Sequence, residues 1–249
     1  MADSSLSAAR LPRRSFLRYA GATAGTSALL LAGCKKDDSG PATPSIVDVG
    51  SGDAGALNLA LALEQIELAF YLAVQQGDYY KNLAADSAER QVLDDLALHE
   101  NQHVQLLRNQ LTAANSIRVL TTDFSGVNFN LRLAAAGATT LGVLDAARAL
   151  EDLGVAAYNG AARYITGAIN LMLTAKIVSV EARHAALIRD LIAYNSFVGG
   201  DIIDTFVPSG APGMGTGSGL ERTLTPAQVV VEANKFLKEG SKLTAPKLV

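Results

Sequence analysis

Two of the three histidines in the sequence follow a glutamate at the same spacing. The pairs are Glu100–His103 and Glu181–His184. Residues three positions apart lie on one face of an α-helix, so the carboxylate and the imidazole of each pair can reach the same metal ion. Glu-x-x-His pairs on facing helices are typical of two-metal carboxylate sites in helix bundles. The sequence therefore predicts that the two pairs meet at a metal centre.

An internal repeat supplies two further carboxylates. The segment LEQIELAFY aligns with LEDLGVAAY, which matches Glu64 with Glu151 and Tyr71 with Tyr158. The offset is 87 residues here and 81 residues between the two Glu-x-x-His pairs. Two copies of a helix pair related by a pseudo-twofold axis would bring four glutamates and two histidines to one centre. Glu64 stands among Leu and Ala, where an unpaired carboxylate would be costly and a metal ion would offset that cost.

Several of these residues have a simpler interpretation. A single Glu-x-x-His pair can be an exposed contact within one helix. His99 does not fit the repeat, so we expect it on the outer helix face or hydrogen-bonded to a ligand. Glu67 corresponds to Gly154 in the repeat and is either an extra carboxylate beside the metals or a charge on the helix face. Tyr71 and Tyr158 can be read as core aromatics whose hydroxyl groups have a hydrogen-bond partner.

The elements that must position these residues are long helices with few Pro residues. The pattern predicts an all-α four-helix bundle over residues 56–195, and a short helix that begins at Thr225–Pro226 and packs on the bundle within residues 196–249. The expected bundle helices cover residues 56–76, 84–114, 141–166 and 168–195. Residues 115–140 favour helix poorly and form a long crossover between the second and third helices.

Composition narrows the functional classes. The chain has 249 residues, of which 49% are hydrophobic and 18% charged, and its net charge of −3 gives no support for nucleic-acid binding. One cysteine excludes an internal disulfide and a Cys-rich zinc or iron–sulfur site.

The N-terminal segment is typical of an export signal. Arg13 and Arg14 lie in a stretch that resembles a twin-arginine signal, and an uncharged apolar run follows over residues 20–33. The run LAGC resembles a lipobox that ends in Cys34. Residues 1–33 are thus expected to be a signal peptide, and residues 34–55 a flexible tether from the lipidated cysteine. The expected location is a membrane surface facing the periplasm or the cell exterior.

Four segments of the sequence resemble the ferritin-like superfamily: LEQIELAFY, HENQH, LEDLGVAAYNGA and EARHAALIR. The resemblance covers about residues 55–240 and is closest to its exported branch, which includes desiccation-related proteins. It implies these roles: Glu64 and Glu151 as terminal ligands, Glu100 and Glu181 as bridging ligands, His103 and His184 as ligands of one metal each, and Tyr71 and Tyr158 as hydrogen-bond donors to carboxylates near the metals.

The implied cofactor is a pair of iron or manganese ions, since oxygen and imidazole ligands suit both. The expected function is oxygen or peroxide chemistry, or metal handling under stress. The alternative is a non-catalytic desiccation or stress-related envelope scaffold that retains the bundle. The Cys cluster of rubrerythrins is absent, so the sequence identifies no electron donor. A homodimer fits a lipid-anchored chain better than a closed storage cage does.

Overall fold

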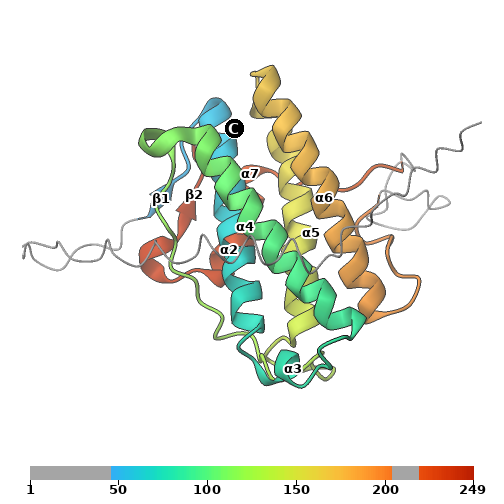
Figure 1. Cartoon of the computed structure of the whole chain (residues 1–249). Helices are drawn as coiled ribbons and strands as arrows, with labels where there is room; N and C mark the ends of the chain where they lie inside the picture. The colour runs from blue at the N-terminus through green and yellow to red at the C-terminus, as the bar shows by residue number, and fades with distance from the viewer. Residues whose placement is uncertain (1–45, 204–218) are drawn as a thin grey trace, which may run out of the picture. The chain divides into compact units, whose positions relative to one another are not determined.

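The computed structural model describes residues 46–203 and 219–249 (Figure 1). In chain order the elements are β1 (Val47–Asp48), α2 (Gly52–Val74), α3 (Asp78–Lys81), α4 (Ala88–Asn115), α5 (Val143–Ala161), α6 (Ala168–Ile192), α7 (Pro226–Ala233) and β2 (Leu243–Thr244). The predicted signal peptide (1–33), Cys34 and most of the tether lie outside the described residues. The same holds for most of the loop over residues 207–219, which the sequence predicts from its Gly and Pro content.

Four long helices form two hairpins, and this confirms the prediction of an all-α bundle. Helix α2 packs mainly against α4, and α5 mainly against α6. The hairpins meet chiefly through α2 and α5, whereas α4 and α6 contact each other less. The chain runs down α2, up α4, up α5 and down α6 in Figure 1, and the crossover returns it from the top of the bundle to the bottom.

Helix α2 is apolar because it lies at the centre of this bundle. Every residue from Gly55 to Glu67 is buried. Among the described helices it is the one long and apolar enough to cross a membrane, but 78% of its most apolar stretch is buried inside the protein. A run of Leu and Ala combines high helix propensity with apolar surface on every face, which suits a helix packed on all sides.

The first helix ends at Val74, two residues before its predicted end, and Gly77 is the N-cap of α3. The lack of a side chain on Gly77 is a requirement there. A Cβ atom at this position would lie 2.4 Å from the carbonyl oxygen of Phe129 in the crossover. The crossover therefore packs directly on the α2–α4 connection. The short helix α3 in this connection was not predicted.

The third helix begins later and ends earlier than predicted. Leu141 exchanges backbone hydrogen bonds with Gly126 and Asn128, so the helix starts only at Val143. At the other end, Ala162–Tyr164 form a 3₁₀ turn. Asp53 at the start of α2 accepts hydrogen bonds from the backbone of Thr166 (2.8 Å) and Gly167 (3.0 Å) in the α5–α6 connection. The bond from Thr166 and one from the Asn170 side chain contribute most to lowering the pKa of Asp53 to about 2.

A buried ion pair joins the helices of the second hairpin. Arg189 on α6 is 6% exposed and donates to both carboxylate oxygens of Asp152 on α5, at 2.8 and 2.6 Å. It also donates to Asp201 in the following loop. A bidentate Arg–carboxylate pair restricts how the two helices can slide or rotate. The pair therefore helps to hold the register of α6 against α5.

The C-terminal segment packs on the bundle through α7, which contacts α5. Thr225 caps α7 and Pro226 is its first residue, as predicted. Leu224 donates to the carbonyl of Ala156 on α5. Its own carbonyl lies so close to Gly160 that a Cβ there would clash at 1.8 Å.

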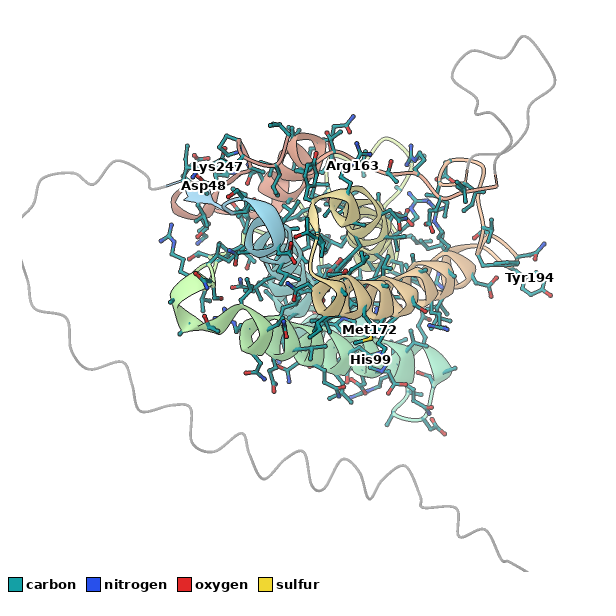
Figure 2. All side chains as sticks on the ribbon, turned by 90° about the horizontal axis from the view of Figure 1, so that it is seen from above. Asp48, His99, Arg163, Met172, Tyr194 and Lys247 are labelled. Atoms are coloured by element: carbon teal, nitrogen blue, oxygen red, sulfur yellow. The ribbon has the colours of Figure 1, made fainter. Side chains whose placement is uncertain are left out.

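The tether differs from its prediction at its C-terminal end. Residues 47–48 pair in parallel with residues 243–244, and Lys247 Nζ lies 3.0 Å from Asp48 Oδ2 (Figure 2). Helix α2 starts at Gly52. Regular structure is therefore present before residue 55, because this stretch forms backbone hydrogen bonds and an ion pair with residues near the C-terminus.

Candidate metal centre

All four bundle helices contribute to one polar cluster in the core. Helices α2 and α5 supply one carboxylate and one tyrosine each, and α4 and α6 supply the Glu-x-x-His pairs. The members are Glu64, Tyr71, Glu100, His103, Glu151, Tyr158, Glu181 and His184. The structure thus brings together all six predicted ligands and both predicted tyrosines.

The six candidate ligands form two overlapping groups. One group is Glu64, Glu100, His103 and Glu181, and the other is Glu100, Glu151, Glu181 and His184. Within each group one ligand atom from every residue lies within 4.8 Å of the others. Glu100 and Glu181 belong to both groups. Such sharing is what two bridging carboxylates between adjacent metal ions require.

The donor atoms of the first group converge on one place. His103 Nδ1 lies 2.9 Å from Glu181 Oε1, and 3.1 Å from both Glu64 Oε2 and Glu100 Oε2. A ring nitrogen carries at most one hydrogen, which cannot satisfy three acceptors in good geometry. One ion at the centre of these atoms would satisfy all of them.

The second group shows the same pattern more strongly. His184 Nδ1 lies 3.0 Å from Glu100 Oε1 and 3.5 Å from oxygens of Glu151 and Glu181. Despite these distances, neither His184 Nδ1 nor Glu100 Oε1 has a partner in hydrogen-bond geometry. Glu151 Oε2 and both carboxylate oxygens of Glu181 are also buried without one. Buried polar atoms without partners are rare in native proteins and indicate a place where an ion or a water molecule binds.

The cluster concentrates charge where water cannot reach it. Glu64, Glu100, Glu151 and Glu181 are each 0% exposed. Burial, and then the charge of Glu181, raises the pKa of Glu64 well above its usual value. Burial raises the pKa of Glu151 to about 8. In the absence of metal, protons must therefore balance part of the negative charge.

The histidines hold such protons. Burial by itself would lower the pKa of His103, but the carboxylates of Glu100, Glu181 and Glu64 raise it to about 12. The imidazoles in turn outweigh the effect of burial on Glu100 and lower its pKa to about 2. Divalent cations would replace these protons, because metal ligation requires a neutral imidazole and ionised carboxylates.

The two tyrosines connect the halves of the bundle crosswise. Tyr71 on α2 donates to Glu151 Oε1 on α5, and Tyr158 on α5 donates to Glu64 Oε1 on α2, both at 2.5 Å. Burial and the adjacent carboxylates raise the pKa of both phenols well above 10. Each tyrosine therefore keeps its proton and orients a terminal carboxylate. The pseudo-twofold relation predicted from the repeat is present in these contacts.

His99 is hydrogen-bonded to the candidate ligand His184, which is one of the two positions predicted for it. Its Nδ1 lies 3.0 Å from His184 Nε2, and it stands on the side of α4 that faces α6 (Figure 2). A hydrogen bond to the outer nitrogen fixes which nitrogen of His184 faces the carboxylates.

Glu67 is an extra carboxylate beside the cluster and not a charge on an exposed helix face. It is 2% exposed, its Oε1 has no partner, and burial raises its pKa well above the usual value. A Cβ on Gly154 would lie 3.0 Å from Glu67 Oε1. The glycine thus makes room for the carboxyl group. The repeat aligns Glu67 with Gly154, but the sequence does not show that these two residues lie against each other.

The donor set fits a pair of divalent metal ions. It consists of carboxylate oxygens and imidazole nitrogens, which suit iron and manganese. Its unpartnered atoms point to the places that two ions would take. Metal binding by these six residues stays a prediction, which the experiments below test.

Comparison with known protein families gives the same answer about the fold. The family described as a ferritin-like domain matches residues 52–194, which is more than half of the chain. The chain therefore belongs to this family, and the matched region covers α2 to α6. Comparison with curated protein sequences gives no match.

Metal binding should release protons and strengthen as the pH rises. At neutral pH His103, with a pKa of about 12, and most of Glu151, with a pKa of about 8, are protonated without metal. Each ion must displace such protons, so affinity falls as the pH falls. Calorimetric titration of Mn(II) in two buffers with different ionisation enthalpies measures the protons released. A binding enthalpy that is independent of the buffer would contradict this charge balance.

Removing both tyrosine hydroxyls should weaken metal binding without abolishing it. The double substitution Tyr71→Phe/Tyr158→Phe is expected to lower affinity by about 10–100-fold, as typical for losing the groups that orient ligands, while two ions still bind at saturation. Competition with a chelator measures the affinity. Tyr79→Phe is the matched control, because its hydroxyl donates to Glu89 outside the cluster at the same distance of 2.5 Å. Equal losses in both variants would show that the effect is not specific to the cluster.

Proposed function

We propose that this ferritin-like protein binds two iron or manganese ions in its core and uses them in oxygen or peroxide chemistry, or in metal handling, under stress. The observation that carries the proposal is the pair of overlapping ligand groups that share Glu100 and Glu181. In this arrangement Glu64 and His103 belong to one ion, and Glu151 and His184 to the other.

Each part of the cluster has a distinct task. The two shared carboxylates keep the ions adjacent, and the terminal carboxylates are held by the tyrosine hydroxyls. A bound pair of iron or manganese ions would supply two electrons as both ions pass from +2 to +3, which is what reduction of dioxygen to peroxide, or of peroxide to water, requires. Burial of the cluster excludes bulk water, and the stacked His99 and His184 connect it to the partly exposed face of α4.

Protons are also held inside the core. Glu67 has a raised pKa and lies next to Glu181 across Gly154. Burial and the neighbouring carboxylates favour the protonated form of this carboxyl group, which lies beside the cluster. Reduction of oxygen species consumes protons, so a buried protonated carboxyl group suits this chemistry.

The proposed location is a membrane surface outside the cytoplasm. The arginine pair, the apolar run and the lipobox-like end at Cys34 support export by the twin-arginine route followed by lipidation. This route carries folded proteins, so metal could be inserted before export. The desiccation-related branch of the family is the proposed affiliation because it shares the exported form.

Metal content tests the central part of the proposal. Purified protein offered Fe(II) or Mn(II) should bind two ions per chain by mass spectrometry, and Glu100→Ala/Glu181→Ala should bind neither, because each of the two residues serves both ions. The control is Glu232→Ala/Glu239→Ala, the same chemical change at two exposed glutamates that pair with surface lysines. A folded wild-type protein that binds no metal would leave the non-catalytic scaffold as the function.

Anchoring is tested separately. Cys34→Ser should move the exported protein from the membrane fraction to the soluble fraction, since a single residue carries the lipid. Arg13→Lys/Arg14→Lys should keep the protein in the cytoplasm. Fractionation followed by immunoblotting measures both outcomes. A Cys34→Ser protein that stays with the membrane would show that another segment anchors it.

A further inference from the structure

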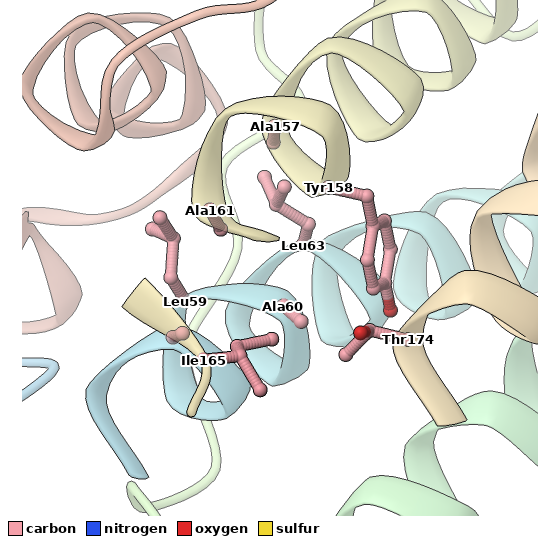
Figure 3. A pocket seen from close by; sticks show the side chains of 9 residues that line it. Leu59, Ala60, Leu63, Ala157, Tyr158, Ala161, Ile165 and Thr174 are labelled. Carbon is pink, nitrogen blue, oxygen red and sulfur yellow. The ribbon is translucent and has the colours of Figure 1, made fainter. Parts of the chain in front are cut away.

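A small cavity lies between α2, the end of α5 and the start of α6 (Figure 3). The centre of a water-sized molecule has about 10 Å³ in which to move inside it, so the cavity has room for one small molecule. All nine lining residues are less than one tenth exposed. They are Ala56, Leu59, Ala60, Leu63, Ala157, Tyr158, Ala161, Ile165 and Thr174.

The cavity adjoins the candidate metal centre. Tyr158 forms one of its walls, and the hydroxyl of the same residue donates to Glu64 Oε1 at 2.5 Å. Leu63, which also lines the cavity, precedes Glu64 on α2. One side chain therefore separates a molecule in the cavity from a candidate metal ligand.

The lining selects against water. Seven of the nine lining residues are Ala, Leu or Ile. The hydroxyl hydrogen of Tyr158 goes to Glu64, and that of Thr174 goes to backbone carbonyls of its own helix, those of Asn170 and Leu171 at 3.0 and 3.1 Å. Both hydroxyls can therefore only accept further hydrogen bonds. A buried water commonly makes about three hydrogen bonds, whereas apolar cavities stay dry and bind apolar guests such as xenon.

The cavity occurs on one side of the pseudo-twofold axis, because the corresponding place beside Tyr71 is filled. The repeat places Phe70 where Ala157 stands, Val74 where Ala161 stands, and Leu93 where Thr174 stands. These three larger side chains are each 0% exposed, and the ring of Phe70 packs edge-on against Tyr71 at 5.1 Å. The same helix arrangement is thus compatible with full packing. Packing does not require the small residues beside Tyr158, and unfilled space lowers stability.

We propose that this cavity binds dioxygen and delivers it to the metal pair from the Tyr158 side, so that dioxygen and not hydrogen peroxide is the oxidant of the centre. The assignment rests on the proposed function. Dioxygen is small and apolar and loses little on leaving water. Hydrogen peroxide would exchange its hydrogen bonds to water for two acceptors at most, which is unfavourable.

The test fills the cavity with the side chains that the repeat uses beside Tyr71. The first variant, Ala161→Val/Thr174→Leu, copies Val74 and Leu93 with small changes in volume. The second, Ala157→Phe, copies Phe70 and fills the cavity more fully. Val74→Ala is the matched control, because it changes a valine and an alanine in the opposite direction on the other side of the axis.

Two measurements are made on each protein. Crystals of the metal-free protein under xenon pressure report the cavity directly. We expect xenon beside Tyr158 in the wild type and in Val74→Ala, and none there in the filled variants. Stopped-flow oxidation of the Fe(II)-loaded protein should slow about tenfold or more with dioxygen in the filled variants, which corresponds to about 1.4 kcal/mol of barrier. Metal stoichiometry should stay at the wild-type value, and Val74→Ala should react at the wild-type rate.

The outcomes separate this inference from the proposed function. A wild-type protein that binds two ions but no xenon beside Tyr158 would overturn the cavity assignment and leave the metal centre intact. Filled variants that exclude xenon but react with dioxygen at the wild-type rate would overturn the delivery route. Oxidation of the wild type by hydrogen peroxide faster than by dioxygen would overturn the choice of oxidant. If no metal binds, the oxidant assignment fails with the proposed function, whereas xenon still reports on the cavity.

Discussion

Burial of four carboxylates and two imidazoles in a helical core is the constraint on which the rest of the structure depends. Charged groups removed from water are strongly unfavourable unless partners surround them. Here the partners are each other, two tyrosine hydroxyls and protons held at raised pKa values. Several donor atoms still lack a partner. Two divalent cations would replace the protons and satisfy these atoms together, so the same residues that burden the metal-free core would stabilise the loaded one.

This constraint explains why each helix has its particular surface. Helices α2 and α5 each carry one candidate terminal carboxylate and one tyrosine of the cluster, and most of their other residues are buried. Helices α4 and α6 carry the Glu-x-x-His pairs and keep more exposed faces. The crosswise hydrogen bonds of Tyr71 and Tyr158 connect the two hairpins at the site itself. The buried pair of Arg189 and Asp152 holds the second hairpin in register. The same contacts between helices therefore position the candidate ligands and stabilise the bundle.

The sequence predicted the bundle and the cluster because both depend on local, periodic patterns. The Glu-x-x-His spacing and the repeat identified the six candidate ligands and both tyrosines. Three features depend on contacts between distant segments and were not predicted: the pairing of β1 with β2, the close approach of Leu224 to Gly160, and the space that Gly154 leaves for Glu67. Both ends of the third helix differ from the prediction for the same reason. Leu141 is hydrogen-bonded to the backbone of the crossover, and the segment after Ala161 is hydrogen-bonded to Asp53. The cavity beside Tyr158 was not predicted either, because it depends on how side chains of three helices pack together.

Anomalous X-ray diffraction from crystals loaded with Mn(II) or Fe(II) tests the central claim most directly. We expect two anomalous peaks in the core, both between the carboxylates of Glu100 and Glu181. One peak should lie beside Glu64 and His103, and the other beside Glu151 and His184. A single peak, or peaks confined to the protein surface with the core carboxylates still paired to protonated histidines, would contradict it.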